Sequence, residues 1–387
     1  MRFSAAFATL ALFVLPIFAA PSGLIDIQTY RGEKTGKYIV KFKPGVSPKA
    51  WVQKLGLTNS VQWKNFNGLA STLSTDNLNT LRASADVQYI TEDGIVHTTD
   101  TITQTDAPWG LSRLSSPGGL TVKDDTSLNY TYVYDSTAGA GVDIYVVDTG
   151  VYVNHTQFGG RATWGFAAAG YAQADGHGHG THVSGTAAGS QFGVAKAANI
   201  IAVKVLSDGG SGSIAGVVSG LDWVRSQAPT TGRPSVVSMS LGGSANDALD
   251  EAVEALTAAG VHVAVAAGNN EDDAKWYSPA RAPSAVTVGA FDVTDTYAWF
   301  SNYGPLVDIS GPGVDVISSW IGSPDATNSI SGTSMATPHI SGLIAYLLSK
   351  DGSISPAEMT TKLQALSLKN VITEIPADTV NDLAQNA

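Results

Sequence analysis

Five short apolar runs rich in β-branched residues recur in the second two thirds of the chain. Each is nearly continuous rather than alternating, which is typical of strands buried on both faces of a parallel sheet. Helical patterns separate some of them, over 214–227 and 245–260, so the chain predicts an α/β layer fold with a parallel sheet. In such folds ligands bind outside the carboxyl ends of the strands. The five runs are 141–150, 199–207, 235–243, 261–270 and 284–291.

The first hundred residues follow a different pattern. Residues 38–43 alternate like a half-buried strand, and Ser47 and Pro48 predict the start of a helix. A hairpin around 65–68, a short helix within 75–84 and a strand over 86–96 complete the order β-α-β-β-α-β. This order predicts a small ferredoxin-like α+β domain. Residues 97–106 are polar and indicate a linker.

The N-terminus has the pattern of a secretory signal. Arg2 precedes an apolar run that ends in small residues, which predicts a signal peptide over 1–20, cut near Ala19 or Ala20. A signal anchor is the alternative. Pro16 and the shortness of the run disfavour it, because a spanning helix needs about 20 apolar residues. We therefore expect a secreted, extracellular protein without a membrane partner.

The composition and charge narrow the class of protein. Of 387 residues, 43% are hydrophobic and 14% are charged, which is typical of a globular chain. Residues 21–101 hold nine basic and seven acidic residues, whereas the whole chain carries a net charge of −11. A basic first segment would be attracted to an acidic remainder. The acidic remainder argues against nucleic acid as a partner. The chain has no cysteine, and Asn129 and Asn154 begin glycosylation sequons.

Four residues at the ends of predicted elements carry candidate chemistry. Asp148 ends a strand, His179 begins a helix, and Ser334 lies between a glycine turn and the apolar helix over 335–349. A serine hydroxyl is a poor nucleophile until a base takes its proton, and an Asp fixes the tautomer of a histidine base. Asn269 ends another strand, and its amide, with the backbone N–H of Ser334, could bind an oxyanion. The set predicts nucleophilic acyl transfer.

The segment from Asp175 to Thr186 contains three of the seven histidines, His177, His179 and His182. A zinc site is the alternative function for them, but His179 is needed as the base. We expect His182 to order the start of the helix and His177 to lie exposed in a loop. His339 is expected to be a packing residue. It stays open whether His177 tunes the pKa of His179 through repulsion between like charges.

These motifs resemble those of subtilisin-type serine proteases, within them the proteinase K-like group. The resemblance rests on "VVDTG", "HGHGTHVSGT", "SMSLGG", "AAGNN" and "SISGTSMATPH", and it spans residues 105–339. The order Asp, His, Ser is that of subtilisin. The resemblance implies a three-layer subtilisin-like fold and a serine endopeptidase working through an acyl-enzyme. Its catalytic residues would be Asp148, His179, Ser334 and Asn269.

Residues 38–100 resemble the inhibitory propeptide of these zymogens. The resemblance implies an inhibitory propeptide over 21–101, self-cleavage near Thr101–Ile102 and a peptidase domain over 102–387. The partners would be protein and peptide substrates and the chain's own propeptide, and the mature enzyme is expected to be a monomer.

Members of this family bind the peptide as an extra strand between two enzyme segments. The matching residues here are Gly212, Ser213, Ile214, Ser240, Leu241 and Gly242. The pocket for the side chain before the scissile bond would be walled by 240–243 and 266–268, including Ala267 and Gly268. These residues carry no charge, so we expect broad specificity with a preference for apolar or aromatic side chains.

The resemblance also implies one structural calcium site. Its ligands would be the carbonyl oxygens of Pro283 and Ala285 and the carboxylate of Asp308, and oxygen ligands suit this hard cation. A second site of some relatives is not expected, because Pro117 and Val371 stand at the matching positions. The alternatives to an endopeptidase are a catalytically silent binding protein, a metal-dependent hydrolase and an esterase.

Overall fold

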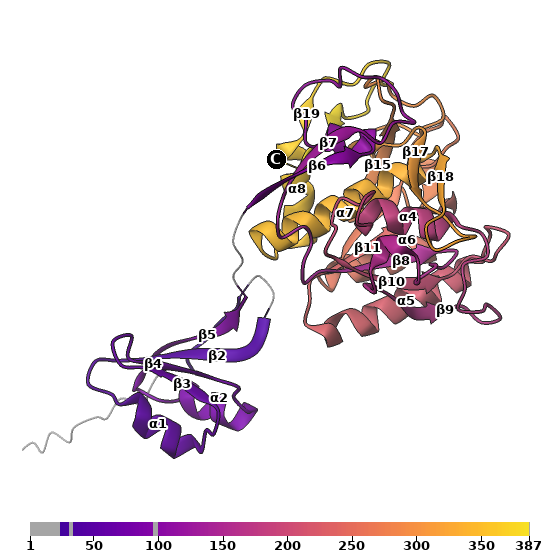
Figure 1. The fold of residues 1–387 in the computed structure, drawn as a ribbon. Coiled ribbons are helices and arrows are strands. Elements are labelled where there is room, and N and C mark those ends of the chain that lie inside the picture. Colours follow the sequence, from indigo (N-terminus) through magenta and orange to yellow (C-terminus); the bar gives the residue numbers. More distant parts are fainter. Residues whose placement is uncertain (1–23, 31–33, 96–99, 387) are drawn as a thin grey trace, which may run out of the picture. The chain divides into compact units, whose positions relative to one another are not determined.

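The structure, a computed structural model, describes residues 24–30, 34–95 and 100–386. The chain divides into a smaller unit that ends at Asp93 and a larger one that continues from Gly94 to the C-terminus (Figure 1). The predicted signal peptide lies outside the described residues. No helix among the described residues has the length and apolar character needed to cross a bilayer.

The smaller unit has the predicted element order, preceded by the two-residue strand β1, which was not predicted. Its sheet has the strand order β1-β5-β2-β4-β3, in which the last four strands have the ferredoxin-like arrangement. Ser47 caps α1 and Pro48 is its first residue, as expected. A small core of its own, including Val40, Phe42 and Leu69, holds the unit together. The elements are β1 (Ile27–Gln28), β2 (Lys34–Phe42), α1 (Pro48–Leu55), β3 (Ser60–Trp63), β4 (Gly68–Ser71), α2 (Thr75–Arg82) and β5 (Val87–Gly94).

The prediction of a polar linker over 97–106 is wrong for most of these residues. Residues 97–99 lie outside the described residues, but β6 (Thr101–Ala107) is a strand that pairs antiparallel with β7 (Tyr130–Asp135). Only Ala107 of β6 is buried. Because strand pairing uses backbone groups, a strand with two exposed faces needs no apolar pattern, and the sequence gives no hydrophobic signal for it.

A nine-stranded sheet forms the centre of the larger unit. Its strand order is β19-β20-β16-β15-β13-β11-β8-β10-β9, and every pair is parallel except β19 with β20. All five predicted strands are present. Strands β9, β16, β19 and β20 were not predicted, because β9 and β16 contain Gly or Pro and β19 and β20 have only two residues each. The strands are β8 (Asp143–Asp148), β9 (Ala162–Ala167), β10 (Asn199–Lys204), β11 (Ser235–Met239), β13 (His262–Ala266), β15 (Val286–Phe291), β16 (Ile309–Pro312), β19 (Leu368–Lys369) and β20 (Asp382–Leu383).

Helices cover both faces of this sheet, which confirms the predicted three layers (Figure 1). On β8, Ile144 and Val146 face the core formed with α4 (His179–Ala188) and α7 (Thr333–Asp351). Tyr145 and Val147 face the opposite core, formed with α5 (Ile214–Thr231) and α6 (Asp247–Ala258). The remaining helices are α3 (Trp109–Leu114) and α8 (Pro356–Leu366). The small strands β12 (Gly243–Ser244), β14 (Tyr277–Ser278), β17 (Val316–Ser319) and β18 (Thr327–Ile330) form two hydrogen-bonded pairs.

Candidate active site

The candidate residues gather at the carboxyl edge of the parallel sheet. Asp148 is the last residue of β8, Ser240 follows β11, and Asn269 lies three residues beyond β13. Neighbouring parallel strands end at the same edge, so these positions lie together. His179 lies at the same edge as the first residue of α4, and Ser334 lies there as the second residue of α7.

Asp148 and His179 form a hydrogen-bonded pair. His179 Nδ1 lies 2.8 Å from Oδ1 and 2.9 Å from Oδ2 of the Asp148 carboxylate. Asp148 is fully buried, and the backbone N–H of Thr149 donates to its Oδ1 at 2.7 Å. A carboxylate can only accept, so Nδ1 carries a proton. In the neutral ring Nε2 then has a free lone pair.

The environment of His179 acts on its pKa in two directions. Burial of the ring is the largest influence and favours the neutral form. The charge of Asp148 and its hydrogen bond oppose this, and Asp175 adds to them, so the pKa of His179 is raised above its ordinary value. His179 therefore holds a proton more firmly than a free imidazole does.

The start of α4 is fixed by a close backbone approach and by one carboxylate. A Cβ atom at Gly180 would lie 2.1 Å from the carbonyl oxygen of Gly150, so only glycine fits there. Asp175 accepts hydrogen bonds from Gly178 N at 2.9 Å and from Thr181 N at 3.0 Å. These contacts place the first turn of α4 directly against the end of β8.

The side chain of Asn269 is held in place through its amide oxygen. Its Oδ1 accepts hydrogen bonds from the backbone N–H and the hydroxyl of Thr333, each at 2.8 Å. Its Nδ2 points to the side of Gly332, where an added Cβ would lie 3.4 Å away. The amide donor is therefore held beside the N-terminus of α7, next to Ser334.

The hydroxyl of Ser334 donates to the carbonyl oxygen of Ser240 at 3.3 Å. Within the described residues no hydrogen bond joins this hydroxyl to His179. The carbonyl oxygen of Ser334 accepts a hydrogen bond from Ser240 Oγ at 2.7 Å, which fixes the backbone of this turn. A serine hydroxyl can rotate, so its proton can be redirected when a substrate binds.

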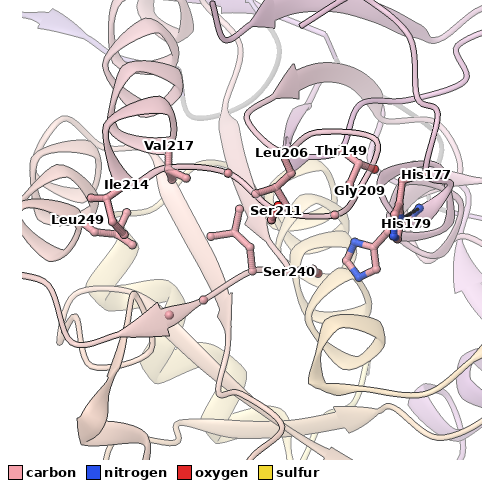
Figure 2. Close-up of a pocket in the computed structure, with 15 residues that line it drawn as sticks. Thr149, His177, His179, Leu206, Gly209, Ser211, Ile214, Val217, Ser240 and Leu249 are labelled. Carbon is pink, nitrogen blue, oxygen red and sulfur yellow. Dashed lines mark hydrogen bonds between the residues drawn. The ribbon is translucent and has the colours of Figure 1, made fainter. Parts of the chain in front are cut away.

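Two cavities lie along these residues and share the residues 241–243. The first, about 450 Å³, contains His177 and His179 at one end and Ile214, Val217 and Leu249 at the other (Figure 2). The second, about 320 Å³, is lined by Ala267, Gly268, Asn269 and Ser334 and by no charged side chain. The predicted substrate-binding residues Gly212, Ile214, Ser240, Leu241 and Gly242 line the first. Ser213 lines neither, since its hydroxyl accepts the Gly216 N–H at the start of α5.

The remaining histidines take different places. His182 is buried, and its Nε2 donates to the carbonyl oxygen of Val316 at 2.9 Å. Burial lowers the pKa of His182 to about 3 and that of His339 to about 4. His339 is a packing group, as expected, whereas His182, expected to order the start of α4, joins that helix to β17. His177 lies in a loop, as expected, but it is half-buried rather than exposed and lines the first cavity.

A network behind Asp148 was missed from the sequence. Thr149 Oγ1 accepts from Gly180 N at 3.0 Å and donates to Asp175 at 2.9 Å. The buried ammonium of Lys204 donates to the carbonyl oxygen of Thr149 and, at 2.7 Å, to Asp208. An isolated lysine within the apolar run 199–206 was the available signal, because a buried cation needs such partners.

The predicted calcium ligands lie partly together. Thr287 N donates to Asp308 Oδ2 at 2.8 Å, and Ala285 is two residues away on the same segment. Burial raises the pKa of Asp308 to about 6. A partly buried carboxylate with a raised pKa would be stabilised by a positive charge, so its chemistry fits a cation. Pro283 lines a groove with α8. Asn129 and Asn154 are exposed.

Comparison with known proteins agrees with the motifs. The sequence profile of the subtilase family matches residues 139–384. The cuticle-degrading serine protease of Arthrobotrys oligospora is 42% identical over 95% of this chain and 95% of its own length. The cuticle-degrading protease of Metarhizium anisopliae is 44% identical over 90% and 89%. A cold adapted subtilisin-like serine proteinase of known structure has a TM-score of 0.66 and 41% identity, over 73% of this chain and 99% of its own. The chain therefore belongs to the subtilase family and is a serine endopeptidase.

Proposed function

We propose that this protein is a secreted endopeptidase of broad specificity, made as a zymogen, in which Ser334 attacks the peptide carbonyl. The hydrogen bond between Asp148 and His179, at the sheet edge that also carries Ser334 and Asn269, is the observation that supports this most.

The proposed reaction has two stages, acylation of Ser334 and hydrolysis of the acyl-enzyme, and the same catalytic residues act in both. His179 Nε2 takes the proton of Ser334 Oγ, which bonds to the carbonyl carbon. The resulting oxyanion accepts hydrogen bonds from Asn269 Nδ2 and Ser334 N. His179 then gives its proton to the leaving amine as the C–N bond breaks. Water attacks the acyl-enzyme in the same way and releases the acid and the free serine.

The neutral second cavity supports a preference for apolar side chains before the scissile bond. We expect tetrapeptide p-nitroanilides ending in Phe or Leu to be cleaved at least about tenfold faster than those ending in Lys or Glu, because burying an unpaired charge is costly. The values of kcat/KM for the four substrates test this. Equal values for Lys and Phe would contradict a neutral pocket.

Asn269 is proposed to stabilise the oxyanion. Asn269→Asp keeps an acceptor for Thr333 but removes the amide donor and adds a negative charge. We expect kcat to fall by about 10²- to 10³-fold with little change in KM, as for loss of an oxyanion donor. Thr333→Val serves as the control, since it removes the hydroxyl contact to Asn269 and keeps the donor. A larger loss in the control than in Asn269→Asp would assign Asn269 a structural role instead.

The smaller unit is proposed to be the inhibitory propeptide. It has a core of its own, and residues 21–101 are basic whereas the rest of the chain is acidic. Two relatives are named for degrading cuticle, a substrate outside the producing cell, which supports secretion. N-terminal sequencing of protein from the culture medium should give a start near Ile102. A start near residue 21 on an active enzyme would contradict a self-cleaving zymogen.

A calcium ion is proposed to bind Asp308 and the carbonyl oxygens of Pro283 and Ala285, where it would offset the charge of the half-buried carboxylate. At a calcium concentration of 100 times Kd, removal by EGTA should cost about 2.7 kcal/mol, or roughly 5–10 °C in Tm. Asp308→Asn should abolish this calcium dependence, whereas Asp292→Asn should keep it. A calcium-dependent Tm in Asp308→Asn would move the site elsewhere.

Glycans on Asn129 and Asn154 and a monomeric mature enzyme complete the proposal. Both asparagines are exposed, as an acceptor must be. Mass loss on treatment with an N-glycosidase tests the first, and sedimentation of the matured enzyme tests the second.

A further inference from the structure

His177 is held rigidly beside the proposed base. Asp175 Oδ1 accepts its backbone N–H at 3.1 Å and that of Gly178 at 2.9 Å. Figure 2 shows His177 and His179 next to each other at one end of the first cavity, and their ring centroids are 6.2 Å apart. The ring of His177 is therefore a fixed part of the cavity wall.

The hydrogen bonds of His177 set the position of its proton. Its Nδ1 lies 3.3 Å from the backbone N–H of His179 and accepts from it. The neutral ring must then carry its proton on Nε2. Nε2 lies next to Gly210, where a Cβ atom added to the glycine would be 3.0 Å from it. Among the described residues Nε2 has no hydrogen-bond partner. Because His177 and Gly210 both line the first cavity, this unused N–H donor lies at the cavity wall.

The direction of an extended substrate decides what meets this donor. Successive side chains of a strand point to opposite sides. The residue whose carbonyl is attacked would place its side chain in the second cavity, because Ser334 and Asn269 line it. The preceding residue would then point to the other side, where His177, His179 and the segment 209–212 line the first cavity.

We propose that His177 selects a hydrogen-bond-accepting, uncharged side chain, such as that of asparagine, at this preceding substrate residue. The inference rests on the proposed function, since it takes Ser334 and His179 as the reacting groups. Two carboxylates lie beside His177 and oppose an acidic side chain. Asp175 accepts its N–H, and Asp208 accepts that of the adjacent Gly176 at 3.2 Å. Lys204 pairs with Asp208, but its ammonium is buried and does not line the first cavity.

Three substrates of nearly equal shape test the proposal. They are Ala-Ala-X-Phe p-nitroanilides in which X is Asn, Asp or Leu, cleaved by matured enzyme whose active sites have been titrated with a fluorophosphonate. We expect kcat/KM for Asn to exceed that for Leu and for Asp by about fivefold, the size of one net hydrogen bond. The Asn-to-Leu ratio is the readout, because it cancels any general change in rate.

Two variants separate the donor from the ring's other hydrogen bond. His177→Asn keeps an acceptor for the His179 N–H but withdraws the donor from the cavity, and the ratio should fall to about one. His177→Gln places an amide donor where Nε2 lies, and the ratio should return. An unchanged ratio in His177→Asn, or its loss in both variants, would overturn the role of the donor. Failure of the wild type to cleave any of the three substrates would instead overturn the proposed function.

Discussion

Replacing Ser334 with alanine is expected to lower kcat for peptide hydrolysis by about 10⁶-fold, the loss known for the equivalent serine of subtilisin. The proposed acyl-enzyme needs an oxygen at this position, and the neighbouring hydroxyl, that of Thr333, is already engaged as a donor to Asn269 Oδ1 at 2.8 Å. The same change should leave residues 21–101 attached, since the proposed maturation uses the same site. Single-turnover hydrolysis and the mass of the secreted chain measure both effects.

The stability of the Ser334→Ala variant is part of this test. The hydroxyl makes one long hydrogen bond, to the carbonyl oxygen of Ser240, so its loss should change Tm by no more than a few degrees. Ser329→Ala, on the exposed side of β18, is the matched control and should retain full activity. Wild-type hydrolysis by Ser334→Ala would mean that another nucleophile acts. A collapse of Tm would mean that the serine is structural.

Asp148→Asn is expected to lower kcat by about 10⁴-fold. An asparagine amide at this position can donate to His179 Nδ1, and the ring would then carry its proton on Nε2. That tautomer cannot take the proton of Ser334. The carboxylate also raises the pKa of His179, so its removal should lower that pKa. Activity that needs the neutral base would then persist to lower pH, and the acid limb of the pH–rate profile should move down.

Asp143→Asn is the matched control for this change. Asp143 is equally buried and stands at the opposite end of the same strand, where it pairs with Arg233 at 2.8 Å. Its replacement should lower Tm and leave kcat and the acid limb unchanged. An acid limb that moves to higher pH in Asp148→Asn would contradict the electrostatic role assigned to the carboxylate.

The strands that place the site were predictable because burial on both faces leaves a strong pattern. Every residue of β8, β11 and β13 is buried and most are apolar, and the proposed catalytic Asp148 ends β8 while Asn269 lies three residues beyond β13. β6 left no such pattern, since its partner β7 pairs with its backbone while its side chains face outward. β16 was missed because a four-residue strand containing Gly and Pro resembles a turn.

The motifs predicted the individual residues of the site better than their surroundings. Local sequence places His179 at a helix start, and the structure agrees. His177 was expected to lie exposed in a loop. Its burial comes from the segment 207–212, about thirty residues further along the chain. The side chain of Ser213 caps α5, since a serine before an apolar helical run is a good N-cap, and the backbone pairing expected for 212–214 stays a prediction.

The close approach of Gly180 to the carbonyl oxygen of Gly150 brings the start of α4 against the end of β8, and there His179 forms its hydrogen bond with Asp148. The rate of peptide hydrolysis should therefore depend strongly on how closely α4 packs against the sheet. On gradual heating we expect kcat to fall at a lower temperature than the far-UV circular dichroism signal. A small displacement of α4 from the sheet separates His179 from Asp148 while the secondary structure persists.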